Sequence, residues 1–172
     1  MPRSAWNEGL WGQFGAAIDM LDNAIVSCPE SLWSDDSGPP QFWYLAYHTL
    51  FFLDYYSSGR DRDYQPPAPF TRGELDPAGV MPERVYSPAE LERYLEHGRA
   101  QCAAEIAALT EARALERCAF ERFDLTVYEL MLYNLRHVQH HAAQLNLLLR
   151  QAVNAAPGWV RKTTRVLEEL PE

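Results

Sequence analysis

The chain has 172 residues, of which 47% are hydrophobic and 23% are charged, and its formal net charge is −9. This length and composition predict a single globular domain, residues 1–172, with enough apolar side chains to bury a core. Because nucleic acids and anionic membranes attract basic patches, the acidic balance argues against either of them as the main partner.

The first two predicted elements are helices. From Trp6 to Ile25, apolar residues recur every three or four positions, which predicts an amphipathic helix. The next segment, QFWYLAYHTLFFLDYY at 41–56, is apolar on nearly every side. Aromatic residues favour strands, but the length of this segment without Gly or Pro favours a buried helix. We expect its aromatic side chains to form core or a dimer face rather than a cofactor site.

A long proline-rich segment follows at 57–87 and shows no helical or strand periodicity. Loops of this length are uncommon in compact domains unless they are functional or connect distant helices. Some four-helix bundles use one or two such connections. We therefore expect a crossover here, and this segment could also cover a pocket.

Two further helices are predicted from their start signals. Ser87 and Glu90 form a capping-box pattern with a proline between them, and an apolar stripe follows. Thr126 and Glu129 form a second capping box, which opens a helix that we expect to run to about Val153. The tail from Pro157, which contains Trp159, is expected to form a docked extra turn. Four helices without strands predict an all-α four-helix bundle with a long crossover between the second and third helices.

The cysteines and the N-terminal stretch favour a cytoplasmic protein. Cys28, Cys102 and Cys118 are odd in number and lack a CxxC spacing, which fits a reducing compartment better than a disulfide framework. Cys102 falls on the apolar stripe of the third helix and is expected to be a small core residue. The start of the chain shows no signal-peptide pattern, and no apolar run is long enough to span a membrane.

Three of the five histidines lie in one short stretch, RHVQHH at 136–141. At about 100° per residue, His137 and His141 lie about 40° apart on the apolar face of the last helix. His140 lies on the flank of that helix. Two imidazoles one turn apart on a helix face can bind the same metal ion. This pair is therefore a candidate for part of a metal site.

A pair of imidazoles leaves a metal ion under-coordinated, so a third ligand is required. His48 is the best candidate, because it lies in the middle of the most apolar helix, where an imidazole needs a partner. His97, at the edge of the third helix's apolar stripe, is a weaker one. The alternative is that these histidines are core residues hydrogen-bonded to polar neighbours. Four polar residues share helix faces with them and are candidates to line a pocket or orient the ligands: Tyr44, Tyr55, Asn134 and Gln144.

Acidic residues are absent from the helix faces that carry the three histidines. Asp54 lies on the far side of its helix from His48, so we expect it to be solvated or paired. A metal-dependent hydrolase uses a general base near the metal. The lack of a carboxylate on these faces therefore counts against hydrolysis.

Several of these stretches resemble one known family. The stretch FWYLAYHTLFFLDYY resembles the second helix of DinB-like (DinB/YfiT) proteins, and RHVQHHAAQLNLLLRQ resembles their last core helix. The N-terminal WGQFGAAIDMLDNAI and the long loop also fit, so the resemblance covers nearly the whole chain. It implies a four-helix bundle with a long crossover, often assembled as a homodimer.

The resemblance also implies a metal site. The three metal-binding histidines of the family map onto His48, His137 and His141. By this resemblance they would bind a divalent ion, commonly zinc or nickel, while His140 has no ligand role. Many members have Arg-Gly between the last histidine and the following glutamine. This chain has Ala142-Ala143 at that place, so a particular substrate does not carry over from other members.

Three neutral imidazoles leave an open position on a metal ion, which is typical of a catalytic site rather than of a closed structural one. Such an ion can keep a bound thiol deprotonated or lower the pKa of bound water. Characterised DinB-like relatives include thiol-dependent S-transferases and isomerases, so the resemblance implies an S-transferase that uses a low-molecular-weight thiol and a small electrophile. The alternatives are a metal-dependent hydrolase and a non-catalytic, metal-stabilised dimer in stress or protein interaction, with the aromatic helix as its interface.

Overall fold

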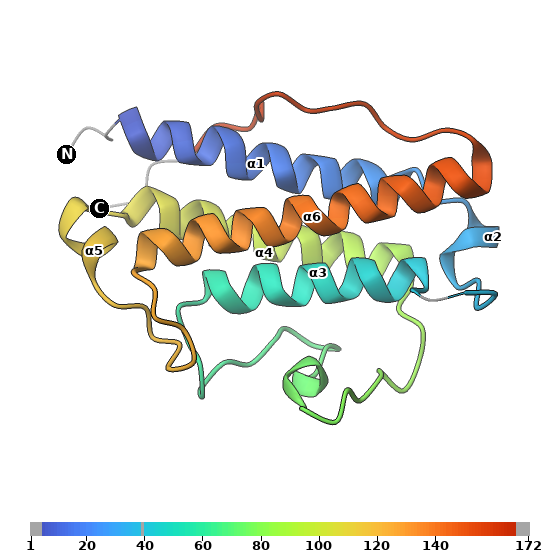
Figure 1. Ribbon diagram of the computed structural model, residues 1–172, viewed down its shortest axis with the longest axis horizontal. Helices are drawn as coiled ribbons and strands as arrows, with labels where there is room; N and C mark the ends of the chain where they lie inside the picture. The colour runs from blue at the N-terminus through green and yellow to red at the C-terminus, as the bar shows by residue number, and fades with distance from the viewer. Residues whose placement is uncertain (1–4, 39, 168–172) are drawn as a thin grey trace.

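Four long helices packed side by side dominate the computed structural model, which describes residues 5–38 and 40–167 (Figure 1). They are α1 (Ala5–Val26), α3 (Phe42–Ser57), α4 (Pro88–Ala108) and α6 (Val127–Val153). The connections contain the short helices α2 (Glu30–Trp33) and α5 (Glu111–Leu115) and the 3₁₀ helix η1 (Arg72–Leu75). Over the described residues no strand forms, and one isolated bridge joins Arg117 and Thr126. The all-α prediction is confirmed.

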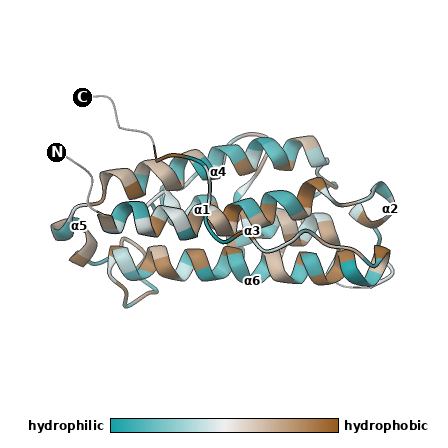
Figure 2. Ribbon diagram, turned by 90° about the horizontal axis from the view of Figure 1, so that it is seen from above, coloured by the Kyte–Doolittle hydropathy of each residue, from teal (hydrophilic) through white to brown (hydrophobic). Residues whose placement is uncertain are grey.

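Each long helix packs against two others. Helix α3 contacts α4 and α6, and α1 contacts the same two helices from the other side. Hydrophobic and hydrophilic residues alternate along these helices (Figure 2), so each helix can turn an apolar face inward. The enclosed core includes Cys102, as expected from its place on the stripe. None of the described helices is both long and apolar enough to cross a membrane.

The two predicted capping boxes are present and set the starts of α4 and α6. The Ser87 hydroxyl accepts from the Glu90 amide at 3.3 Å, and the Glu90 carboxylate accepts from the Ser87 amide at 2.9 Å. Thr126 and Glu129 make the same reciprocal pair at 3.2 and 2.8 Å. Each box satisfies amide groups that the first helical turn leaves free. Helix α6 ends at Val153, where the sequence pattern also ends.

The aromatic helix α3 lies inside the chain's own core. Almost all of its residues are buried, including Tyr47, Phe51 and Tyr55. Helix α3 packs against α4 and α6, and the Tyr47 and Phe51 rings contact Phe70 and Tyr64 of the segment that follows α3. Since the chain itself covers this helix, it does not offer the exposed interface that a dimer built on α3 would need.

The crossover between α3 and α4, residues 58–87, runs along the outside of α3 (Figure 1, green). The Tyr64 hydroxyl donates to Asp54 on α3 at 2.6 Å. The Phe70 ring stacks on Tyr94 of α4 with 4.1 Å between ring centroids. These contacts hold the crossover against the long helices and bring η1 close to the middle of α3.

The tail after α6 docks as extended chain and not as the expected extra turn. The Trp11 indole donates to the Arg165 carbonyl at 2.8 Å, and the Thr163 amide donates to the Gly12 carbonyl at 3.0 Å. A Cβ on Gly15 would lie 2.5 Å from Thr163 Cγ2, so only glycine permits this close approach. The tail therefore lies against α1 at Gly12 and Gly15, the two positions where no side chain separates the backbones.

Candidate metal centre

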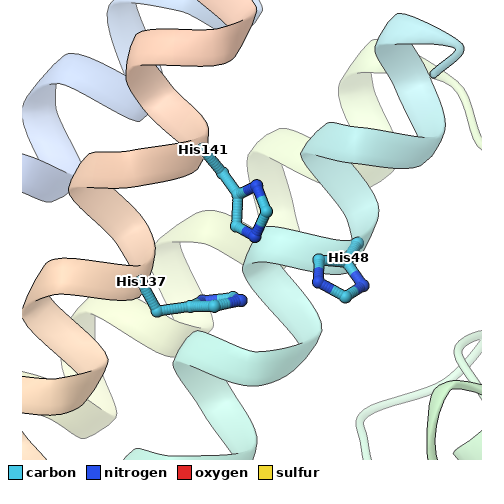
Figure 3. Close-up of side chains that lie close together, drawn as sticks. All are labelled: His48, His137 and His141. Atoms are coloured by element: carbon cyan, nitrogen blue, oxygen red, sulfur yellow. The ribbon is translucent and has the colours of Figure 1, made fainter. Parts of the chain in front are cut away.

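Three imidazole rings from two helices converge where α3 packs against α6 (Figure 3). His48 comes from α3, and His137 and His141 project from successive turns of α6. The ring centroids are 5.4 Å apart for His48 and His137, 5.0 Å for His48 and His141, and 4.5 Å for the pair on α6. One nitrogen from each ring lies within 4.8 Å of the others. Tetrahedral zinc–nitrogen bonds of about 2.0–2.1 Å place the nitrogens about 3.4 Å apart, so the rings would have to move toward one another to bind an ion.

The packing of α6 on α3 is fixed one turn before His137. The side-chain amide of Asn134 is buried and donates to the Leu53 carbonyl at 3.1 Å and to the Ser57 hydroxyl at 3.3 Å. Both acceptors belong to α3. Asn134 thus acts as a clamp between the two ligand-bearing helices, and its amide nitrogen points to α3 rather than to the histidines.

Two of the imidazoles are oriented by hydrogen bonds at Nδ1. His48 Nδ1 lies 2.7 Å from Glu74 Oε2, and His141 Nδ1 lies 2.6 Å from Gln144 Oε1. An oxygen acceptor at Nδ1 selects the tautomer in which Nε2 carries the free lone pair. These contacts leave Nε2 of each ring available as a ligand atom, as in metal-binding histidines generally.

His137 has a buried Nδ1 without a hydrogen-bond partner among the described residues. A buried polar atom in this state costs about 1–3 kcal/mol. The alternative of core histidines bonded to Tyr44, Asn134 or Gln144 therefore describes only His141. A metal ion bound at Nδ1 would satisfy this atom, whereas an ion bound at Nε2 would leave it without a partner. The donor set of three imidazoles fits a divalent ion such as zinc or nickel.

Burial keeps the rings on α6 in their neutral form. It is the main cause that lowers the pKa of His137 to about 3, and three neighbouring imidazoles add to the effect. Burial also lowers the pKa of His141, against the raising effect of its hydrogen bond to Gln144. A neutral imidazole has a free lone pair, which a metal ligand requires. At neutral pH both rings are ready to bind an ion.

The same pKa values predict an acid-sensitive fold in metal-free protein. In the unfolded chain a histidine titrates near about 6.5. Below that pH the unfolded state binds protons that folded His137 does not bind until about pH 3, so acid favours unfolding. We expect the free energy of unfolding, measured with urea in chelator, to fall as the pH drops from about 6.5. His137→Gln should flatten this fall, whereas His140→Gln should not, and equal slopes for all three proteins would contradict the expectation.

Aromatic side chains form one wall of the site. The Phe52 ring lies 4.8 Å from that of His48 and 5.5 Å from that of His137, between ring centroids. The Tyr44 ring, one turn before His48 on α3, lies 6.3 Å from the His48 ring between centroids. Burial, and then the nearby Glu74 carboxylate, raise the pKa of Tyr44 to about 12. Its hydroxyl therefore stays protonated and is a hydrogen-bond donor at neutral pH.

Tyr55 is placed in the aromatic core rather than on this wall. Its hydroxyl donates to Asp61, and its ring packs against Phe120 with 4.8 Å between centroids. It shares a helix face with His48, but seven residues of α3 separate them by about 10 Å along the helix axis. The helical period predicted the face of α3 on which Tyr55 lies, but not how far along the helix it lies from the histidines.

The two other histidines lie outside the cluster. His97 Nε2 is 3.2 Å from Asp54 Oδ1, on the side of α3 that faces α4. His140 is exposed on α6, with its ring 5.0 Å from that of His141. The cluster of possible metal ligands contains neither of them.

Glu74 is the site residue that sequence reasoning missed. It belongs to η1 in the crossover, 26 residues from His48, and its side chain is 3% exposed. The stretch Thr71-Arg72-Gly73-Glu74 does have the S/T-x-x-E spacing that marks a helix start. That signal could have located η1. It could not have shown that the carboxylate reaches α3.

A family model described as the DinB superfamily matches residues 13–145. No match was found among curated proteins or among solved structures. The matched range contains both ligand-bearing helices up to Leu145, and thus all three clustered histidines. The chain belongs to the DinB superfamily.

Proposed function

We propose that this protein is an enzyme that holds one divalent ion, zinc or nickel, at His48, His137 and His141. Its reaction joins a low-molecular-weight thiol to a small electrophile. The sulfur forms a bond to the electrophilic carbon, the bond from that carbon to its leaving group breaks, and the thiol proton passes to water. We further propose that it works as a homodimer in the cytoplasm.

The observation that carries this proposal is a ligand set of three imidazoles. In the part of the chain that the structure describes, no Cys, Asp or Glu joins the three histidines in the cluster. Structural zinc sites use four protein ligands, whereas catalytic sites keep one position open. All three rings are half-buried rather than enclosed. This arrangement supports a site that a small molecule can enter.

A divalent ion at this place would supply the positive charge that keeps a bound thiol deprotonated. The chain supplies the placement. The three imidazole ligands bring no negative charge to the ion, while Glu74 and Gln144 orient two of the rings at Nδ1. The Phe52 ring beside His48 and His137 covers apolar area next to the ligands and limits the approach of water there.

A hydrolase is less well supported by the same geometry. A general base must lie within hydrogen-bond reach of the attacking water. Glu74 is near the site, but its Oε2 contacts His48 Nδ1. If Nε2 is the ligand atom, this carboxylate lies behind the ligand and away from the open position. Glu74 therefore supplies a carboxylate near the site, but not at the position where a general base would act on the attacking water.

We expect zinc- or nickel-loaded protein to conjugate a thiol to monochlorobimane, with chloride as the leaving group, about 10²-fold faster than chelated protein. Cysteine, glutathione and coenzyme A are the first thiols to test, and thioether fluorescence is the measurement. His140→Ala serves as control, because this exposed residue lies outside the cluster. Rates that chelation leaves unchanged for every thiol would refute the transferase proposal.

A further inference from the structure

Glu74 is a carboxylate from an irregular segment that is nevertheless almost completely buried. Its side chain is 3% exposed, and one of its oxygens, Oε2, lies 2.7 Å from His48 Nδ1. The other oxygen, Oε1, is buried and has no hydrogen-bond partner among the described residues. Burying a carboxylate is costly unless a positive charge or donors compensate it. Its neighbours on α3 are His48, whose contact is an ion pair only if the ring is protonated, and Tyr44, whose hydroxyl also interacts with this carboxylate.

A metal ion on the other nitrogen of His48 would change the energetics of this contact. The ring would still donate its Nδ1 proton to Glu74, and it would also share the positive charge of the ion. The buried carboxylate is therefore better compensated when the site is loaded. By thermodynamic reciprocity, a group that is stabilised by metal binding must itself strengthen that binding.

Because of the position of Glu74, its contact with His48 also links the crossover to α3. Glu74 sits in η1, at the middle of the crossover, and Thr71 caps η1 by accepting from the Gly73 amide at 3.4 Å. The Tyr47 hydroxyl donates to the Thr71 carbonyl at 3.4 Å. A cavity of about 380 Å³ lies beside these residues, lined by the crossover and, from α3, by Tyr47. The Tyr47 hydroxyl, the Glu74–His48 pair and the interaction of Tyr44 with Glu74 link the η1 region to α3.

We propose that Glu74 is a positioning residue, which fixes the ring of His48 and couples docking of the crossover to metal binding. The inference rests on the proposed metal site at His48, His137 and His141. Loss of the carboxylate removes the orientation of one ligand and also the tie between η1 and α3. Metal affinity and protection of the crossover should therefore change together.

The test uses the untagged full chain with zinc as the probe and compares Glu74→Ala and Glu74→Gln with wild type. Zinc affinity, measured by competition with a chromophoric chelator, should fall about 10–100-fold in Glu74→Ala. Glu74→Gln keeps an acceptor but no charge, so its loss should be smaller. Zinc should slow proteolytic cleavage within residues 58–87 of wild type and should give Glu74→Ala no such protection.

Glu83→Gln is the matched control, because Glu83 is an exposed carboxylate on the same crossover. Urea unfolding in chelator separates a purely structural role from positioning. Lower metal-free stability of Glu74→Ala with unchanged zinc affinity would mark Glu74 as an anchor only and overturn the inference. Wild type that binds no zinc would overturn the metal site as well, so the two failures are distinguishable.

Discussion

His137→Ala and His48→Ala should each abolish metal binding and the thermal stabilisation that the metal gives to wild type. Wild type should carry about one zinc or nickel ion per chain, measured by plasma mass spectrometry on untagged protein. A free metal concentration 100-fold above the dissociation constant stabilises the fold by about 2.7 kcal/mol. For a chain of this size that raises the melting temperature by roughly 5–10 °C. Neither variant should show this rise.

His137→Ala also tests whether the unpartnered nitrogen belongs to a metal ligand. Removing a buried polar atom that has no hydrogen bond should cost the metal-free protein little beyond lost packing. The variant should therefore resemble chelated wild type in stability. His140→Ala and His97→Ala are the controls, because both residues lie outside the cluster and both variants should keep their metal. Wild type that is empty and takes up neither ion would refute the site.

The long helices could be predicted from the sequence because their signals are local. Periodic apolar residues mark their lengths, and the capping boxes at Ser87 and Thr126 mark two of their starts to the residue. Helices α2 and α5 were not predicted from the sequence, because four or five residues make barely one helical turn. Such short helices show no periodicity, and they form where the surrounding chain positions them.

Two of the clustered histidines were predictable from one helix alone. The spacing of His137 and His141 fixes them on one face, whatever the rest of the fold does. His48 required an argument from its apolar surroundings, since a buried imidazole needs a partner. Glu74 could not be found in this way, because its position depends on how the crossover folds back across α3. That path is set by contacts between distant residues, and helix periodicity carries no information about it.

Asp54 shows the same division between local and distant information. The helical period put it on the face of α3 opposite His48, and the sequence left open whether it was solvated or paired. The structure shows a carboxylate that is 1% exposed. It accepts from the Tyr64 and Tyr94 hydroxyls at 2.6 and 3.3 Å, and His97 Nε2 lies 3.2 Å from it. These partners come from the crossover and from α4, so only the fold reveals them.

Burial raises the pKa of Asp54, and the hydrogen bond from Tyr64 and the interaction with His97 act in the opposite direction. The carboxylate is tolerated in the core because these groups compensate it. Together they join α3, α4 and the start of the crossover in one polar network. A change at Asp54 should therefore affect both global stability and the docking of the crossover.

We expect Asp54→Ala to lower the free energy of unfolding by about 2–4 kcal/mol, because the buried hydroxyls of Tyr64 and Tyr94 lose their shared acceptor. The melting temperature should fall by roughly 5–15 °C, and proteolysis within residues 58–87 should become faster. Asp54→Asn keeps an acceptor for Tyr64 and should lose less of both. Wild-type stability in Asp54→Ala would mean that the stacked Phe70 and Tyr94 rings hold the crossover without the polar network.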